Sequence, residues 1–362
     1  MKPRRQALGL TLVELLVSIS IGLVVVGALA ALYISTARSY RQLEALGQLQ
    51  SNARYVFEIM GYDIRMAGNW TCHVPSQPAP ANFVSNYTTQ WWSNTDRPLF
   101  GQDETTDNNA VGDASFPADY KSQALRGDTL IALRASADDT IGTVGTYDLS
   151  AGSIPFTNPS SKGFKAGTLL LLTDCSTTAK VLQKTGPSTS DETSPIEHKT
   201  TANCRDDLTG SCASLGNTQN MSGAKVVPLS ANAYYLRNSG RKYGNSSNYI
   251  PSLYRQTLTT SGNAPGTTGQ ELVSGVTDLQ ILYGVGAPSA DGTLVINAYA
   301  TASNVSDWSR VLSVRVTVTL ESQDDNVSDV SRSFTLGNGT VVTDRRLRRS
   351  YTMTFGLRKR LS

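Results

Sequence analysis

The stretch that decides the fold lies near the N-terminus, where residues 9–37 read GLTLVELLVSISIGLVVVGALAALYISTA. Residues 15–37 carry no charged side chain. Because an α-helix rises about 1.5 Å per residue, roughly 20 residues cross the ~30 Å apolar core of a bilayer. The run therefore predicts a single membrane-spanning helix. Lys2, Arg4 and Arg5 precede it, which predicts a cytoplasmic N-terminus and places the rest of the chain across the membrane.

A cleaved secretory signal peptide is the alternative interpretation of this segment. Such peptides end at a small-residue site after a short apolar region, and Ala28-Leu29-Ala30 fits that pattern. The apolar run, however, continues past Ala30 to Ile34. Glu14, the one charge between residues 9 and 37, is also unusual in a plain signal peptide. Both features favour a retained helix.

Glu14 lies where an unpaired carboxylate is costly in lipid. One interpretation is an interfacial acid that marks the start of the helix and is stabilised by the positive end of the helix dipole. The other interpretation is that this charge has a partner outside the chain. The residues around Glu14 favour the second interpretation.

The basic leader, Gly9, and an apolar segment with an acid at its fifth position resemble the N-terminal signal of type IV prepilins and pseudopilins. The resemblance implies that a prepilin peptidase cuts after Gly9 and N-methylates Leu10, a position where members usually have Phe. The cut leaves an α-ammonium on Leu10. In a bundle of such helices, Glu14 would pair with a neighbour's ammonium and set the axial register, because neither charge is tolerated alone in an apolar medium.

Residues 38–67 continue the helix as an amphipathic segment without proline. Apolar residues recur there at the period of one buried helix face. That face is predicted to contain Leu43, Leu46, Leu49, Ala53, Phe57, Met60, Ile64 and Ala67. The chain thus divides into a leader (1–9), a membrane-spanning or filament-core helix half (10–37), an amphipathic helix half (38–67) and a β-rich globular domain (68–362).

The globular domain is predicted to be an antiparallel sheet with long loops. Apolar and polar residues alternate over 311–320 and 350–357, and around Ile281, as in half-buried strands. Further strands are predicted at 129–134, 168–173, 233–237 and 252–258, and Gly337-Asn338-Gly339 predicts a hairpin turn. Residues 74–125 and 184–222 are predicted to be loops. The fold class is therefore α+β and type IV pilin-like, with a long N-terminal helix packed on the sheet.

Further strings narrow the resemblance to PilW-type minor pilins of type IV pilus assembly. They are QSNARY (50–55), DIRMAG (63–68) followed by Cys72, ELVSGVTDLQ (271–280) and DRRLRR (344–349). The resemblance implies a minor pilin that takes part in initiating pilus assembly, with a place at the tip, and that supports twitching motility and adhesion. It implies a single-pass inner-membrane protein with a periplasmic domain that later enters the pilus at the cell surface.

The partners that the resemblance implies are other minor pilins, the major pilin, the prepilin peptidase and the inner-membrane assembly platform. Two alternatives stay open. A J-type minor pseudopilin of a type II secretion system shares the helix and the signal, although the C-terminal basic strings favour the pilus version. A pilus-tip adhesin or DNA-uptake subunit would act through the loops at 74–125 or 184–222.

Four cysteines in an exported chain predict disulfides, and four allow three connectivities. Cys204–Cys212 is favoured because a short separation closes a small loop at little entropic cost. Cys72–Cys175 then follows by elimination and would tie the end of the helix to the sheet. A four-thiolate zinc site is disfavoured because close pairs of cysteines are missing.

The remaining chemistry predicts neither an enzyme nor a cofactor or metal. The chain has no G-x-S-x-G, P-loop, G-x-G-x-x-G or H-E-x-x-H motif, and its only histidines are His73 and His198. Residues 107–113 resemble a calcium loop weakly, but Val111 takes a ligand position, so we expect a turn.

The charge distribution disfavours a nucleic-acid binder. The chain holds 32 Lys and Arg against 29 Asp and Glu, so without the three basic leader residues its net charge is zero. Seven basic residues nevertheless gather near the C-terminus: Arg345, Arg346, Arg348, Arg349, Arg358, Lys359 and Arg360. A patch for DNA or anionic lipid is one interpretation of this cluster. A solvated strand edge, or a docking face for acidic partners, is the favoured one.

Overall fold

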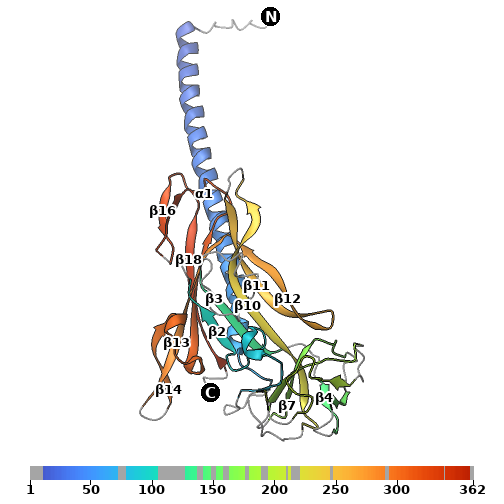
Figure 1. Cartoon of the computed structure of the whole chain (residues 1–362). Helices are drawn as coiled ribbons and strands as arrows, with labels where there is room; N and C mark the ends of the chain where they lie inside the picture. The colour runs from blue at the N-terminus through green and yellow to red at the C-terminus, as the bar shows by residue number, and fades with distance from the viewer. Residues whose placement is uncertain are drawn as a thin grey trace, which may run out of the picture.

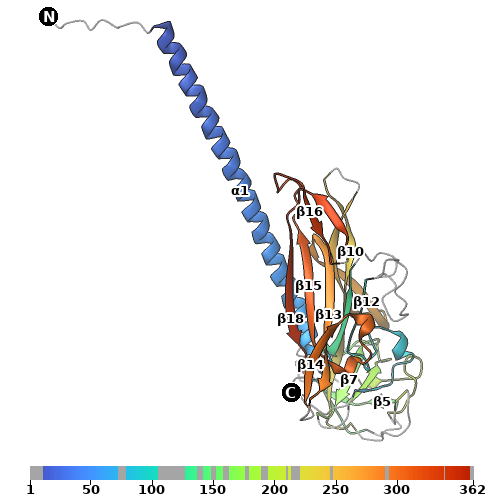
Figure 2. The same ribbon diagram turned by 90° about the vertical axis from the view of Figure 1, so that its left-hand side faces the viewer.

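The computed structural model describes residues 11–71, 79–104, 127–136, 142–147, 152–157, 163–175, 179–188, 195–208, 211–212, 221–244, 248–289, 293–337 and 339–358. Its dominant feature is one helix, α1 (Leu12–Met66), of 55 residues. The first half of α1 projects away from the domain, and the second half is packed against it (Figures 1 and 2). The predicted continuous helix and the α+β class are confirmed.

The larger sheet is built around one very long strand, β10 (Lys225–Lys242). Its order is β1-β8-β7-β10-β11-β12, and β2, β3, β4 and β6 attach beside this path. The bounds of these strands are β1 Ala81–Asn82, β2 Leu99–Gln102, β3 Thr129–Ala135, β4 Gly142–Val144, β6 Phe156–Thr157, β7 Leu169–Thr173, β8 Ala179–Gln183, β11 Tyr249–Ser261 and β12 Ala264–Ser274. The first residues of β10 pair with β7, and its later residues pair with β3 and β11. The strand therefore joins the body of the domain to a distal lobe around β4 and β7, which lies at the end away from the projecting half of α1 (Figure 1).

The second sheet has the order β14-β13-β15-β18 and is antiparallel throughout. Its strands are β13 (Val276–Pro288), β14 (Leu294–Ala300), β15 (Val311–Glu321) and β18 (Arg348–Gly356). A hairpin of β16 (Arg332–Thr335) and β17 (Val341–Asp344) lies beside α1 at the end of the domain from which the helix projects (Figure 1). Two short strands, β5 (Ser153–Ile154) and β9 (Ile196–Glu197), pair separately. Three one-turn 3-10 helices cover Tyr87–Thr89, Ala302–Asn304 and Trp308–Arg310.

The main core lies where the second half of α1 meets both sheets. Leu49, Val56, Met60 and Ile64 of the helix are almost completely buried in it. They share one cluster with inward-facing residues of both sheets, among them Leu130, Tyr234, Ile281, Val314 and Phe355. Two further clusters fill the rest of the larger sheet and the distal lobe. The helix is thus an integral part of the domain from Leu49 onward.

The predicted strands are found at or close to their predicted places. The observed strands β3, β10, β11, β13 and β15 contain the predicted ranges, whereas β7 begins one residue later and β18 ends one residue earlier than predicted. The predicted hairpin is formed by β16 and β17. The prediction of loops is wrong in part, because β1, β2 and the 3-10 turn Tyr87–Thr89 lie within 74–125 and β9 lies within 184–222. The predicted buried stripe of the helix is right from Leu49 to Ala67 but wrong at Leu43, which is 68% exposed. The alternation predicted for 350–357 is also only partly right, because Met353 is 46% exposed.

Candidate functional site

The start of α1 is capped by Thr11, whose Oγ1 accepts a hydrogen bond from the Glu14 backbone N–H at 3.3 Å. Glu14 itself is exposed in the first turn of the helix. The cap uses only the amide of Glu14, so its carboxylate is left available to another molecule. Gly9 and Leu10, the predicted processing residues, lie outside the described residues.

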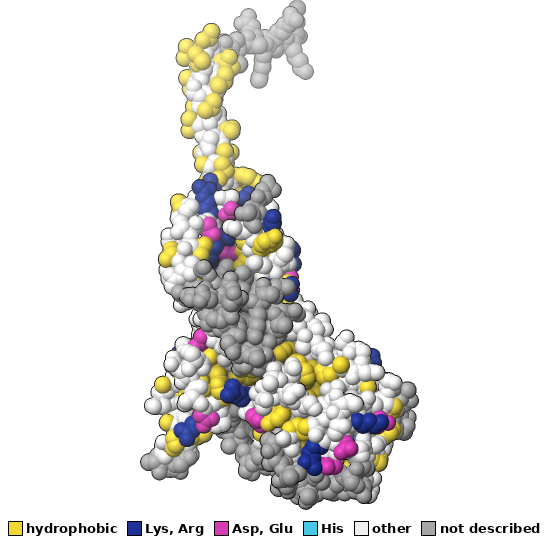
Figure 3. Space-filling view, in the orientation of Figure 1, with side chains coloured by type: hydrophobic (Ala, Val, Ile, Leu, Met, Phe, Trp, Pro, Cys, Tyr) yellow, Lys and Arg dark blue, Asp and Glu magenta, His cyan; other side chains and the backbone are white. Residues whose placement is uncertain are grey.

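Apolar side chains cover the first half of α1 in the view of Figure 3, and all of residues 12–36 are exposed. Leu12, Ile21, Leu23, Val24 and Leu32 are each at least 60% exposed. By length and composition α1 can cross a membrane, and within the described residues it is the one helix that can. A rod of this kind needs either lipid or other helices around it.

The other half of α1 is fixed to the domain by a buried carboxylate, Asp63, which is 3% exposed. Its Oδ1 accepts a hydrogen bond from Nε of Arg134 on β3 at 2.9 Å. Its Oδ2 accepts from Asn232 Nδ2 and from the Tyr234 hydroxyl on β10, both at 2.6 Å. Burial, and then the charge of Asp63, raise the pKa of Tyr234 well above its usual value. The sequence analysis missed this site, although an acid on the buried side of a helix is itself a signal of a buried partner.

Close packing reinforces this attachment at Gly61. A Cβ at this position would lie 2.4 Å from Cε1 of Phe355 on β18, so only glycine fits. The Phe355 ring also contacts Phe57, with centroids 6.2 Å apart, and the guanidinium of Arg65 lies 5.4 Å from its centre. Gly22, Gly27 and Gly47, in contrast, have open space around them.

A second buried acid, Asp128, joins the two sheets. Its carboxylate accepts hydrogen bonds from the backbone N–H of Ile281 on β13 at 2.6 Å and from that of Glu104 at 2.8 Å. The pKa of Asp128 is raised to about 7, chiefly by burial; these two hydrogen bonds act against the rise, and the nearby charges of Asp103 and Asp278 add to it. Asp128 is therefore a pH-sensitive contact between the sheets.

The distal lobe holds the predicted disulfide Cys204–Cys212, which the structure contains. Cys175 is also disulfide-bonded. Its predicted partner, Cys72, lies outside the described residues, so the pairing Cys72–Cys175 stays a prediction. Among the described residues no group of three or more His, Cys, Asp and Glu side chains is placed to hold a metal. The Asp107–Asp113 segment lies outside the described residues.

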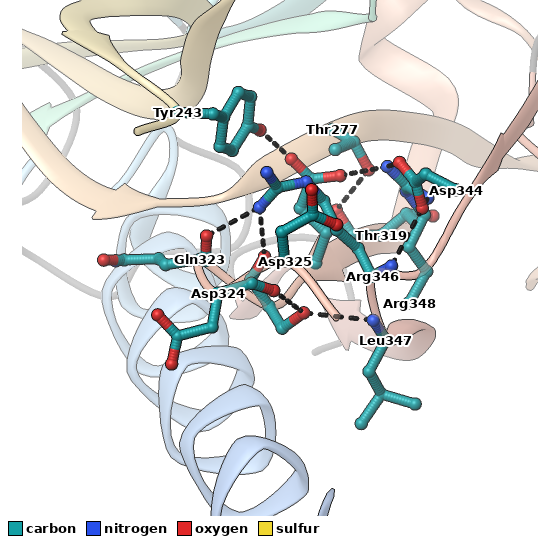
Figure 4. Close-up of polar contacts among 12 residues, drawn as sticks. Tyr243, Thr277, Thr319, Gln323, Asp324, Asp325, Asp344, Arg346, Leu347 and Arg348 are labelled. Atoms are coloured by element: carbon teal, nitrogen blue, oxygen red, sulfur yellow. Dashed lines mark hydrogen bonds and ion pairs between the residues drawn. The ribbon is translucent and has the colours of Figure 1, made fainter. Parts of the chain in front are cut away.

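Two of the basic residues near the C-terminus, Arg346 and Arg348, make polar contacts within their own domain (Figure 4). Arg348 is 9% exposed and is paired with Glu321 and Asp344. Arg346 donates to the carbonyl oxygens of Ser322 and Gln323 and lies over the ring of Tyr243. These two side chains hold the loop after β15 to the start of β18, so neither interpretation of the cluster describes them.

The other basic residues of that cluster differ in their surroundings. Arg345 and Arg349 are exposed, and Arg345 donates to Asn326 Oδ1 at 3.2 Å. Arg358 is exposed as well. Lys359 and Arg360 lie outside the described residues.

Two family models match this chain, one in its C-terminal part and one at its N-terminus. The family model for type IV pilus-assembly protein W matches residues 233–359, a range that starts in the middle of β10 and ends three residues after β18. The model for the prokaryotic N-terminal methylation motif matches residues 4–30, which include Gly9, Leu10 and Glu14. No curated protein and no solved structure matches the chain.

Proposed function

We propose, from the matches to the family models for type IV pilus-assembly protein W and for the N-terminal methylation motif, that the chain is a minor pilin involved in pilus assembly. In this proposal it helps to initiate the pilus from the inner membrane and takes a place at the pilus tip. Before assembly, residues 10–37 span the membrane with the N-terminus in the cytoplasm. Residues 68–362 fold in the periplasm. The bare apolar half of α1 carries this proposal, because it has no partner within its own domain.

In this proposal the prepilin peptidase cuts after Gly9 and methylates the new N-terminus at Leu10. Extraction into the filament exchanges lipid for the helices of neighbouring pilins. Glu14 then pairs with a neighbour's α-ammonium, because a carboxylate in an apolar medium needs a compensating charge. The exposed position of Glu14 supports this role.

The rigid joint between helix and domain supports a structural role in assembly. Asp63 and Gly61 hold the buried half of α1 against β3, β10 and β18. When neighbouring subunits fix the axial position of the helix, the position of the domain is thereby fixed as well. We propose that the chain supplies no catalysis and works through contacts with other minor pilins, the major pilin and the assembly platform.

N-terminal sequencing of the mature protein tests the processing step. We expect a methylated Leu10 as the first residue. The Gly9→Val variant should keep its leader, because a peptidase that accepts glycine at the cut has little room for a branched side chain. Gly22→Val, at a position with open space around it, is the matched control and should be processed normally. A mature chain that begins at another residue, or a Gly9→Val chain that is cut at the same site, would refute the proposal.

The match at residues 233–359 favours a pilus over a secretion pseudopilus as the site of action. Deletion of the gene should therefore reduce surface pili and twitching motility and leave protein secretion intact. Loss of secretion with normal piliation would favour the J-type pseudopilin instead.

A further inference from the structure

A cavity of 520 Å³ lies between α1 and the C-terminal part of the domain, at the end from which the bare helix projects. On the helix side it is lined by Ser39, Gln42, Leu43 and Leu46. On the domain side it is lined by Val327 and Ser328, by residues 332–334 of β16 and by residues 346–349. The cavity begins two residues beyond the uncharged run that ends at Ala37.

Part of the wall of this cavity is apolar. Leu43, Leu46, Val327, Phe334 and Leu347 contribute to it. Leu43 is 68% exposed although it belongs to the apolar stripe of the helix, so its own domain does not cover it. Such a surface favours an apolar ligand or part of one.

The polar residues of the cavity are basic or neutral, and none of the described residues that line it is acidic. Arg348 and Arg346 are already bound to acids and carbonyl groups of the domain. Arg332 and Arg349 are exposed and form no ion pair within the described part of the chain. The cavity thus carries two positive charges that form no ion pair within the described residues, a fit for an anionic group.

Two buried polar atoms at this cavity also lack partners. Ser328 is 7% exposed, and its Oγ has no hydrogen-bond partner within the described residues. The same is true of Nε of Arg348. Buried polar atoms without a partner are rare in folded proteins and point to a missing polar ligand.

We propose that this cavity binds one anionic phospholipid at the periplasmic surface of the membrane, with the phosphate at Arg332, Arg349 and Ser328 and the start of an acyl chain along Leu43 and Leu46. Its place on the chain fits, because Ser39 lies just beyond the segment proposed to span the bilayer. Figure 3 shows Lys and Arg side chains, with some acids among them, gathered at this end of the domain. The inference rests on the proposed membrane anchoring, but not on cleavage of the leader or on pilus assembly.

Native mass spectrometry of the full chain in neutral detergent tests this proposal. Phosphatidylglycerol, phosphatidylcholine and inorganic phosphate are added separately. We expect one phosphatidylglycerol to be retained in preference to the other two. In Arg332→Gln/Arg349→Gln its retention should fall by roughly tenfold or more, because charged hydrogen bonds to the phosphate are lost. Arg97→Gln/Arg310→Gln, a double change of exposed arginines away from the cavity, is the matched control and should behave as the wild type.

Each contrary outcome overturns a stated part of the proposal. Equal retention by the wild type and the Arg332/Arg349 variant would exclude this cavity as the site. Binding of inorganic phosphate as strong as that of the lipid would exclude a role for the apolar walls. A photo-crosslinker at Leu43 in native membranes should capture phospholipid, and capture of protein alone would assign the cavity to a neighbouring subunit. All of these outcomes leave processing at Gly9 untouched, so failure here is distinguishable from failure of the proposed function.

Discussion

Asp63 of α1 and Arg134 of β3 form a largely buried ion pair, with Arg134 Nε 2.9 Å from Asp63 Oδ1. The side chain of Arg134 is 12% exposed and that of Asp63 is 4% exposed. The pair lies at the end of the helix opposite to Glu14. Since the Asp63 carboxylate also accepts hydrogen bonds from Asn232 and Tyr234, its charge is well compensated. The arrangement fixes both the rotation and the axial position of α1 on the larger sheet, which a subunit assembled through its helix requires.

Asp63→Asn should destabilise the domain by about 3 kcal/mol, because it leaves the Arg134 guanidinium buried without its counter-charge. Urea unfolding of the full chain in detergent, followed by tryptophan fluorescence, measures the loss. Asp307→Asn removes an exposed pair with Arg310 and should cost less than about 1 kcal/mol. Equal unfolding midpoints for the two variants would show that the buried pair does not hold the helix.

Gly61→Ala should also destabilise the domain, by roughly 1–3 kcal/mol, because its Cβ would overlap the ring of Phe355. The same unfolding measurement applies. Gly47→Ala is the control: it adds a Cβ where there is open space, and should leave the domain unchanged or slightly more stable. Adding Phe355→Leu to Gly61→Ala should reduce the effect of the alanine. If the double variant shows simple additivity, the contact with Phe355 is not the cause.

The contact of Asp128 between the sheets should make stability depend on pH. The folded-state pKa of Asp128 is about 7, against about 3.9 in an unfolded chain. The folded chain therefore keeps a proton that the unfolded chain releases. The contribution of this group to stability is full below pH ~4 and is lost above about pH 7. Between these values it declines by at most roughly 1.4 kcal/mol per pH unit.

Comparison of the wild type with Asp128→Asn between pH 5 and 8 isolates this effect, since the other titratable groups are common to both proteins. We expect the stability of the wild type to fall relative to that of the variant as pH rises. A difference that stays constant across this range would place the titration elsewhere.

The helix and three of the four strands of the second sheet (β13, β15 and β18) could be predicted from the sequence because each follows a simple period, and the hairpin could be predicted from its turn residues. Leu49, Ala53, Phe57 and Met60 repeat every three to four residues, and Val314 and Val316 lie two apart, so local spacing alone decides which side is buried. The uncharged run to Ala37 needs only length and composition.

Other parts escaped prediction because their signals are not local. β8 contains Lys180, which reads as a surface residue, but its side chain is buried and its Nζ donates to the Leu208 carbonyl oxygen at 2.8 Å. Burial lowers the pKa of Lys180 to about 8. Gly61 is needed only because Phe355 lies opposite it. Contacts between residues far apart in the chain cannot be derived from the spacing of either one.

Glu14→Ala should leave insertion into the membrane intact, since removal of a charge from the edge of an apolar run makes transfer into lipid easier. The variant should nevertheless be recruited poorly into the assembly, because a neighbour's α-ammonium would lose its counter-charge in an apolar medium. Membrane fractionation measures the first effect, and co-purification with the other pilins measures the second. Glu44→Ala, a change of an exposed acid beyond the membrane-spanning half of the same helix, is the control and should co-purify normally. If Glu14→Ala co-purifies with its partners as well as this control does, the pairing with a neighbour's α-ammonium is wrong. The carboxylate would then only stabilise the N-terminus of the helix, which Thr11 already caps.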